Sequence, residues 1–221
     1  MNESRGWVRP AAAVVGAWVL VLAVVLGVGW LLTHPLEPTV DPFDDDVARW
    51  FAGERTGDLD RVADVGTFLG ETVVGSAVAG LVGLVVSVWR RSVRPAVCMA
   101  LLLAGIGGLY AIVTALVTRD RPPVRILDPG LVPDHSFPSG HVATAVAAYA
   151  GSAVLLWWAT PRARPWALLL LVLPVLVLLA RLYQGAHHVT DVLTSVVYTT
   201  TWLAVLARAV LLRGPSGTME R

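Results

Sequence analysis

Long runs of apolar residues constrain this chain more than any other feature of its sequence. The first run, residues 11–32, contains no charged residue. A helix needs about 20 apolar residues to cross the hydrocarbon core of a bilayer, and the chain contains six runs of roughly that length. They predict an all-α, polytopic membrane protein, with residues 1–221 forming one domain, a bundle of six transmembrane helices. The predicted spans are residues 11–32, 66–89, 96–117, 139–158, 166–183 and 187–212.

The composition excludes several classes of protein. Charged residues make up 15% of the chain, against about 25% in an ordinary soluble domain. This deficit excludes a disordered chain and most soluble enzymes, and it gives no basic face for a nucleic-acid partner. The single cysteine, Cys98, excludes a disulfide framework and a cysteine-ligated zinc site. The first apolar run is too long for a signal peptide and lacks a cleavage motif, so we interpret it as a retained anchor.

All 17 positively charged residues are arginines, and their placement predicts the orientation. Six spans put both termini on one side, which carries ten arginines and only two acids, Glu3 and Glu220. Arginine-rich segments stay in the cytoplasm, so we expect cytoplasmic termini. Arginine in place of every lysine is typical of a GC-rich bacterial genome, which indicates a bacterial plasma membrane. The ten arginines are Arg5, Arg9, Arg90, Arg91, Arg94, Arg162, Arg164, Arg208, Arg213 and Arg221.

The segment between the first two spans is polar and acidic. Within it, Val47, Trp50 and Phe51 recur at helical spacing after the acidic run Asp44–Asp46. The pattern fits a short helix lying on the membrane surface. It fits equally a loop with a few apolar residues.

Three polar clusters fall at the outer ends of the predicted helices. They are Arg119–Pro123 after the third span, Phe137–His141 at the start of the fourth, and Arg181–Asp191 between the fifth and the sixth. Taken singly, they are explained by a helix stop, a serine cap and loop histidines. Because all three lie at the same depth, they can meet in a bundle.

Together the clusters fit phosphate chemistry. Ser139 and Gly140 open a helix, where free backbone N–H groups favour an anion. Arg121 and Arg181 come from different helices, and guanidinium groups can grip phosphate oxygens bidentately.

The histidines supply the reactive groups of the predicted site. His187 and Asp191 are four residues apart and would share a face of the sixth helix. A carboxylate there can accept Nδ1–H and leave Nε2 free to attack. His141, on a separate helix, can protonate the leaving oxygen.

The clusters resemble the three-part signature of the type 2 phosphatidic acid phosphatase family, shared with vanadium haloperoxidases. That signature reads Lys-x6-Arg-Pro, then Pro-Ser-Gly-His, then Ser-Arg-x5-His-x3-Asp. The second part matches in full, while the family lysine is Thr114 here and the family serine is Ala180. The positions that match are Arg121, Pro122, Pro138, Ser139, Gly140, His141, Arg181, His187 and Asp191.

The resemblance implies a role for each matching residue. His187 would be the nucleophile that forms a phosphohistidine, Asp191 would orient it, and His141 would be the general acid. The phosphoryl oxygens would be held by Arg121, Arg181, Ser139 and Gly140. The family works without a metal, so we expect no metal and no other cofactor. The expected partners are the lipid phosphate substrate and membrane lipids, and the sequence does not indicate an oligomeric state.

Other polar residues near the clusters receive weaker interpretations. Arg119 is two residues before Arg121, and we hypothesise that it restores the charge missing at Thr114. His188 is interpreted as a neighbour that shapes the pocket. The remaining candidates, more simply explained as loop or helix-end charges, are Asp64, Glu71, Arg125, Asp134 and His135.

The sequence therefore predicts a metal-independent phosphatase acting on a lipid phosphate or diphosphate at the outer membrane face. Polyprenyl diphosphate, phosphatidic acid and phosphatidylglycerol phosphate are the candidate substrates. One alternative is a lipid phosphotransferase that uses the same site. Another is a transporter or structural membrane protein without catalysis. The haloperoxidases share the motifs but are soluble.

Overall fold

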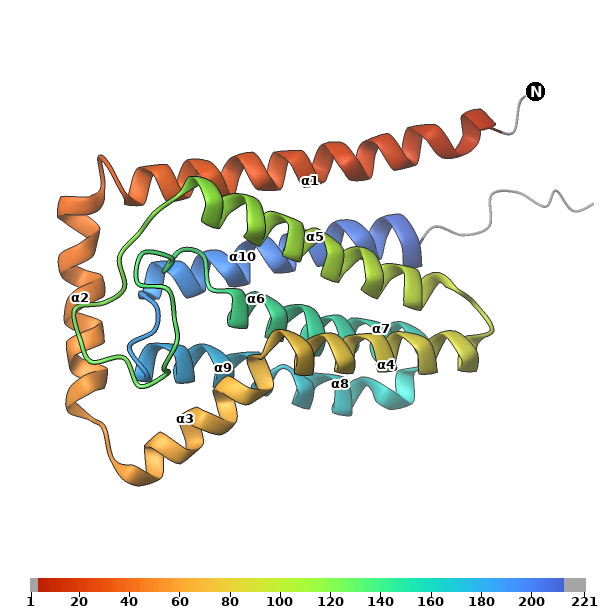
Figure 1. Ribbon diagram of the computed structural model, residues 1–221. Helices are drawn as coiled ribbons and strands as arrows, with labels where there is room; N and C mark the ends of the chain where they lie inside the picture. The colour runs from red at the N-terminus through yellow and green to blue at the C-terminus, as the bar shows by residue number, and fades with distance from the viewer. Residues whose placement is uncertain (1–3, 213–221) are drawn as a thin grey trace, which may run out of the picture.

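The computed structural model describes residues 4–212, with side chains described from Ala11 onward, and this part of the chain is helical without a strand (Figure 1). Six stretches are long and apolar enough to cross a membrane, which confirms the predicted fold class. They are Ala11–Leu32, Thr72–Arg90, Arg94–Leu116, Gly140–Ala159, Pro161–Tyr183 and Val189–Leu211. Glu3, Arg213, Glu220 and Arg221 lie outside the described residues, as do the side chains of Arg5 and Arg9.

The elements follow one another through short connections, except for the long loop between α5 and α6. The elements are α1 (Ser4–Leu32), α2 (Glu37–Gly53), α3 (Gly57–Gly70), α4 (Thr72–Arg90), α5 (Arg94–Leu116), α6 (Gly140–Ala145), the π-helix η1 (Val146–Ala150), α7 (Gly151–Ala159), the 3-10 turn η2 (Pro161–Ala163), α8 (Arg164–Leu170), α9 (Val172–Tyr183), α10 (Val189–Leu206) and the π-helix η3 (Ala207–Leu211). The fourth span, Gly140–Ala159, is central, since 72% of its most apolar stretch is buried.

The second span begins later than predicted. Apolar and small residues continue back to Gly66, but the backbone turns sharply at Glu71, where ψ is 140°. Gly66 and Gly70 therefore belong to α3, which packs against α9. A Cβ on Gly66 would lie 2.7 Å from the Cβ of Ala180, and one on Gly70 would lie 2.6 Å from Val177 Cγ1. This glycine pair thus allows α3 and α9 to pack closely.

Pro174 interrupts the fifth span. Proline offers no N–H to the carbonyl one turn earlier, and its ring crowds that carbonyl. Helix α8 accordingly ends at Leu170, and α9 begins at Val172. The span itself starts at Pro161, five residues before the predicted boundary.

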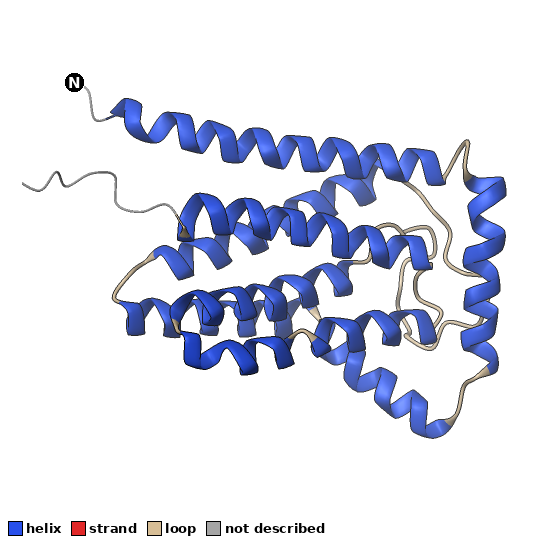
Figure 2. Ribbon diagram, turned by 180° about the vertical axis from the view of Figure 1, so that it is seen from behind, coloured by secondary structure: helices blue, strands red, loops and turns tan. Residues whose placement is uncertain are grey.

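The acidic segment after α1 is a helix, so the alternative of a loop is wrong. Helix α2 lies across one end of the bundle, and α3 leads back to the spans (Figures 1 and 2). In α2, Asp44 is completely buried, while Phe43 and Trp50 are 59% and 60% exposed. This amphipathic helix therefore presents acids to the bundle and large apolar side chains outward.

Candidate active site

The three polar clusters meet at the end of the bundle that α2 crosses (Figure 1). The loop between α5 and α6 reaches the third cluster, because Arg119 Nη1 donates to Asp191 Oδ1 at 2.6 Å and Arg121 donates to the Ala186 carbonyl. The same loop ends at Ser139, the residue directly before α6. These two contacts join residues that are 72 and 65 positions apart in the sequence. They bring the polar clusters together, as the sequence predicts.

His187 lies between α9 and α10 rather than on a helix, and its ring is buried. Its Nδ1 is 2.6 Å from the backbone carbonyl oxygen of Ser136. A carbonyl can only accept, so Nδ1 carries the proton and Nε2 keeps its lone pair. Burial, followed by the positive charge of Arg181, holds the pKa of His187 well below its ordinary value. The imidazole is therefore neutral at neutral pH, as a nucleophilic nitrogen must be.

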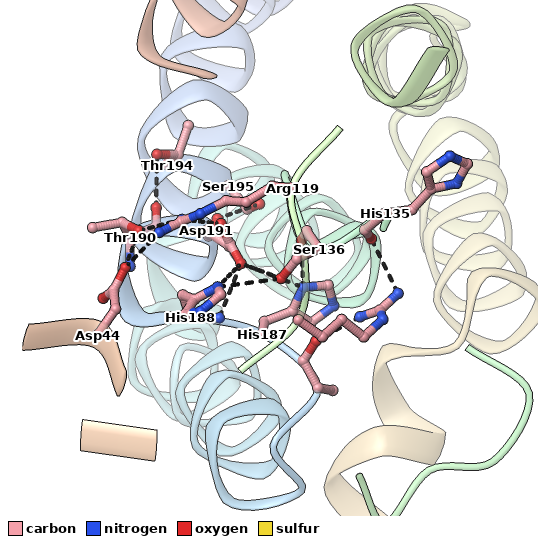
Figure 3. Close-up of polar contacts among 12 residues, drawn as sticks. Asp44, Arg119, His135, Ser136, His187, His188, Thr190, Asp191, Thr194 and Ser195 are labelled. Carbon is pink, nitrogen blue, oxygen red and sulfur yellow. Dashed lines mark hydrogen bonds and ion pairs between the residues drawn. The ribbon is translucent and has the colours of Figure 1, made fainter. Parts of the chain in front are cut away.

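Asp191 does not make the predicted hydrogen bond to His187, since its Oδ2 is 4.0 Å from Nδ1. Helix α10 begins at Val189 because the Asp191 carboxylate accepts the backbone N–H of His188 at 2.9 Å, a capping box. His187 therefore precedes the helix and shares no helix face with Asp191. Asp191 Oδ2 instead accepts the hydroxyl of Ser136 at 2.6 Å. It thus supports the serine whose carbonyl accepts the hydrogen bond from His187 (Figure 3).

Arg181 is completely buried near the end of α9. Its Nη1 donates to Asp128 at 2.8 Å, to Gln184 at 3.1 Å and to Thr67 at 3.2 Å. Its Nε and Nη2 are buried without a hydrogen-bond partner in residues 4–212, and so is the hydroxyl of Ser139 before α6. Each such group costs about 1–3 kcal/mol unless a ligand or a water satisfies it. The arrangement suits an anion with several acceptor oxygens.

Arg121 is fixed by backbone carbonyls. Its Nε donates to Val132 at 2.8 Å, its Nη2 to His135 at 3.0 Å, and its Nη1 to Ala186. Burial, followed by the positive charge of Arg181, lowers the pKa of Arg121. An anion bound between these two guanidinium groups would relieve their repulsion.

Gly140 and His141 form the start of α6, where neighbouring helices approach closely. A Cβ on Gly140 would lie 3.1 Å from the Tyr110 ring of α5. A Cβ on Gly70 of α3 would lie 3.2 Å from the Cβ of His141. The half-buried His141 is therefore held beside α3, on an element separate from His187.

Arg119 is already engaged by carboxylates in this structure. Its side chain is 4% exposed, and both of its Nη atoms are engaged by carboxylates of other elements. Thr114, at the lysine position, donates to the Tyr110 carbonyl of its own helix at 2.9 Å. These contacts hold both Nη groups of Arg119 away from the Thr114 position, and a phosphate contact of Arg119 stays a prediction. The carboxylates that engage Arg119 are those of Asp41, Asp44 and Asp191.

Sequence reasoning missed several residues that shape the site. Ser136 stands next to a recognised motif, which is the only signal that pointed to it. The others carry no local pattern, because long-range contacts define their roles. They are Asp41, Asp44, Thr67, Asp128 and Gln184.

The weaker candidates lie at the edge of the site. Asp64 is exposed but accepts a hydrogen bond from Gln184 at 3.1 Å. His135 contributes its carbonyl, and its ring is 3.9 Å from Asp134. Glu71 and Arg125 are exposed.

Comparisons with known proteins agree with this arrangement. The sequence model of the PAP2 superfamily matches residues 95–215, more than half of the chain. No curated protein matches the sequence. One solved structure, described as the first transmembrane PAP2 type phosphatidylglycerolphosphate phosphatase from Bacillus subtilis, is similar, with a TM-score of 0.77 and 21% sequence identity. The match covers 90% of this chain and 98% of that chain.

The fold, the spans and the motif positions thus agree with one another. The family match contains each of the three polar clusters. The chain is an integral membrane protein that belongs to the PAP2 superfamily, that of the type 2 phosphatidic acid phosphatases, and is a membrane lipid phosphatase by family.

Proposed function

We propose that this phosphatase hydrolyses a lipid phosphate or diphosphate through a phosphohistidine at His187, without a metal. The observation that carries the proposal is the set of buried donors, Nε and Nη2 of Arg181 and the hydroxyl of Ser139, that no described residue satisfies. The positive charge of Arg181 acts on a neutral His187 whose Nε2 keeps its lone pair. A nucleophile beside preorganised anion-binding donors is what phosphoryl transfer requires.

The proposed reaction has two steps. In the first, Nε2 of His187 attacks phosphorus, the ester P–O bond breaks, and His141 gives a proton to the leaving oxygen. In the second, a water attacks phosphorus, His141 takes a proton from it, and the N–P bond breaks to release phosphate. Arg121, Arg181 and Ser139 hold the phosphoryl oxygens in both steps.

The surroundings of Nδ1 support the first step. Positive charge develops on the imidazole as the N–P bond forms. The Ser136 carbonyl, 2.6 Å from Nδ1 of His187, accepts the Nδ1–H hydrogen bond, which strengthens as the ring becomes positive. The Asp191 carboxylate, 4.0 Å away, adds a negative charge in a buried setting.

Phosphatidylglycerol phosphate is the first substrate to test, with phosphatidic acid and polyprenyl diphosphate as the alternatives. The similar solved structure bears the name of a phosphatidylglycerolphosphate phosphatase. Helix α2 and the loop between α5 and α6 crowd this end of the bundle (Figure 2). That crowding favours a lipid with a small headgroup.

We infer that the site faces the outside of a bacterial plasma membrane. Every acid among the described residues lies in 37–71, in 120–134 or at Asp191, on elements at the site end. The connections at the opposite end carry arginines, and positively charged segments stay cytoplasmic. Those arginines are Arg90, Arg91, Arg94, Arg162, Arg164 and Arg208.

Phosphate release from the three lipids by purified protein in mixed micelles, with and without a chelator, tests the proposal. We expect release from at least one lipid, insensitive to the chelator, and an acid-labile phosphoprotein in rapidly quenched reactions. His187→Ala should abolish both signals, and His141→Ala should slow release about 10²–10⁴-fold. His34→Ala, at an exposed histidine stacked on Trp30, is the control and should behave as wild type.

Two outcomes would contradict the proposal. Folded protein that releases phosphate from none of the three lipids would reject hydrolysis. Transfer of the phosphoryl group to an added acceptor lipid, with little free phosphate, would instead favour a phosphotransferase.

A further inference from the structure

Arg119 is the centre of a buried ion-pair network beside the nucleophile (Figure 3). Its Nη1 donates to Asp191 at 2.6 Å, and its Nη2 donates to Asp41 at 2.7 Å and to Asp44 at 3.0 Å. The side chains of Asp44 and Asp191 are 0% exposed. Removal of one partner from a buried pair leaves an uncompensated charge, so each member constrains the others.

The network joins two elements that are far apart in the sequence. Asp41 and Asp44 belong to α2, whereas Asp191 lies in the first turn of α10. Thr190 adds a second connection, because its hydroxyl and its backbone N–H donate to Asp44 and its hydroxyl accepts from Arg119 at 2.7 Å. Arg119 and Thr190 thus fix α2 to the start of α10.

From Arg119 the contacts continue to the nucleophile through Ser136. The backbone N–H of Ser136 donates to the Arg119 carbonyl at 3.0 Å, and its hydroxyl donates to Asp191 at 2.6 Å. Its carbonyl accepts Nδ1–H of His187 at 2.6 Å. Each polar group of Ser136 therefore takes part in the connection between Arg119 and His187.

The surroundings of Arg119 disfavour contact with a substrate anion. A cavity of about 440 Å³ beside it is lined by four acids, Glu37, Asp41, Asp45 and Asp120, and also by Arg119, Arg121 and His188. Burial lowers the pKa of Arg119, but the Asp191 charge and the neighbouring carboxylates outweigh it and raise the pKa overall. Its Nε is buried without a partner in the described part of the chain, so the experiment must show whether that nitrogen reaches phosphate.

We propose that Arg119 is a positioning residue, which ties α2 to Asp191 and Ser136 and thereby sets the orientation of the His187 ring. The proposal rests on the proposed function, because orientation matters only if His187 is the nucleophile. It follows that the position of α2 on the bundle affects kcat and leaves the affinity for phosphate unchanged.

Two substitutions on α2 of the full-length protein test this. Asp44→Asn keeps the shape of a buried member of the network, and Asp46→Asn removes a carboxylate that is 78% exposed and paired with Arg49. We expect Asp44→Asn to lower kcat about tenfold, the loss that one weakened charged hydrogen bond produces. KM and the inhibition constant of inorganic phosphate should stay unchanged. Asp46→Asn should leave all three values as in wild type.

Arg119→Lys provides a second, independent variant. Lysine keeps the charge but lacks the planar fork that reaches several carboxylates. We expect a fall in kcat alone, and a double variant with Asp44→Asn should lose less than the product of the two single effects, because both weaken one contact. Asp41→Asn, at a carboxylate whose side chain is 36% exposed, replaces Asp44→Asn if the latter does not fold.

The outcomes separate this inference from the proposed function. A wild-type kcat in Asp44→Asn would overturn the inference, and so would a phosphate inhibition constant that rises in Arg119→Lys as kcat falls. The latter result would make Arg119 a phosphate ligand. Wild-type protein without phosphatase activity would reject the proposed function instead.

Discussion

Replacement of Arg181 by methionine tests the phosphate site at a single side chain. Methionine keeps the apolar stem but removes every donor. The structure leaves two donors, Nε and Nη2, buried and unsatisfied by residues 4–212, and each would make a charge-assisted hydrogen bond of about 1.5–3 kcal/mol to phosphate. Their loss raises the barrier by about 3–6 kcal/mol, and kcat/KM should fall about 10²–10⁴-fold.

The same change should affect stability much less. The partners of Nη1 keep other contacts, since Thr67 donates to Gln184 at 2.6 Å and the Asp128 side chain is 22% exposed and can be hydrated. Removal of two unsatisfied donors also offsets part of the lost ion pair. We therefore expect Arg181→Met to unfold within about 4 °C of wild type.

Phosphate release in mixed micelles and inhibition by inorganic phosphate are the assays. Arg181→Lys keeps the charge without the fork and should recover part of the activity. His34→Ala, at an exposed histidine stacked on Trp30, serves as the control. If Arg181→Met is folded and retains kcat/KM within about a factor of three of wild type, the assignment of phosphate binding to Arg181 is wrong.

Three further results are expected. Because the pKa of His187 is held well below its ordinary value, the acid limb of kcat/KM, where the ring becomes protonated and loses its lone pair, should lie below pH 6.5; an acid limb centred above pH 7 would contradict this. Extensive treatment with a chelator should leave phosphate release unchanged, and a loss that a divalent cation restores would reject metal independence. Gly70→Ala should lower both kcat and the unfolding temperature, because its Cβ would lie 2.6 Å from Val177 Cγ1 and 3.2 Å from the Cβ of His141. Gly80→Ala, where no described neighbour lies within 4 Å, should change neither and is the matched control.

The sequence predicted the membrane spans because the required apolar length is a local property. The first span ends at Leu32, as predicted. The second does not begin where predicted, because small residues suit both a transmembrane helix and the packed helix α3. Hydropathy does not register the backbone turn at Glu71 that separates the two.

For the site, residue types and clusters were predictable, but their contacts were not. The four-residue spacing suggested that Asp191 accepts a hydrogen bond from His187 on a shared helix face. The capping box at His188 starts the helix after His187, so the two residues share no face. The atom that takes the place of Asp191 is a backbone carbonyl of Ser136, and carbonyls carry no signal in the residue type. The partners of Arg119 come from α2 and α10, so only the tertiary fold shows that this arginine is already engaged.

The unsatisfied donors of Arg181 and Ser139 also have a thermodynamic consequence for the whole fold. The described residues offer these donors no hydrogen-bond partner. Without an anion, the donors therefore reduce the stability of the native state. An anion that binds only the folded protein shifts the folding equilibrium, by about 2.7 kcal/mol at one hundred times its Kd. Unreactive phosphate analogues should therefore raise the unfolding temperature of wild type, and Arg181→Met should lose that response. Occupancy of the site is thus measurable as a shift in the unfolding temperature, without a substrate or a product.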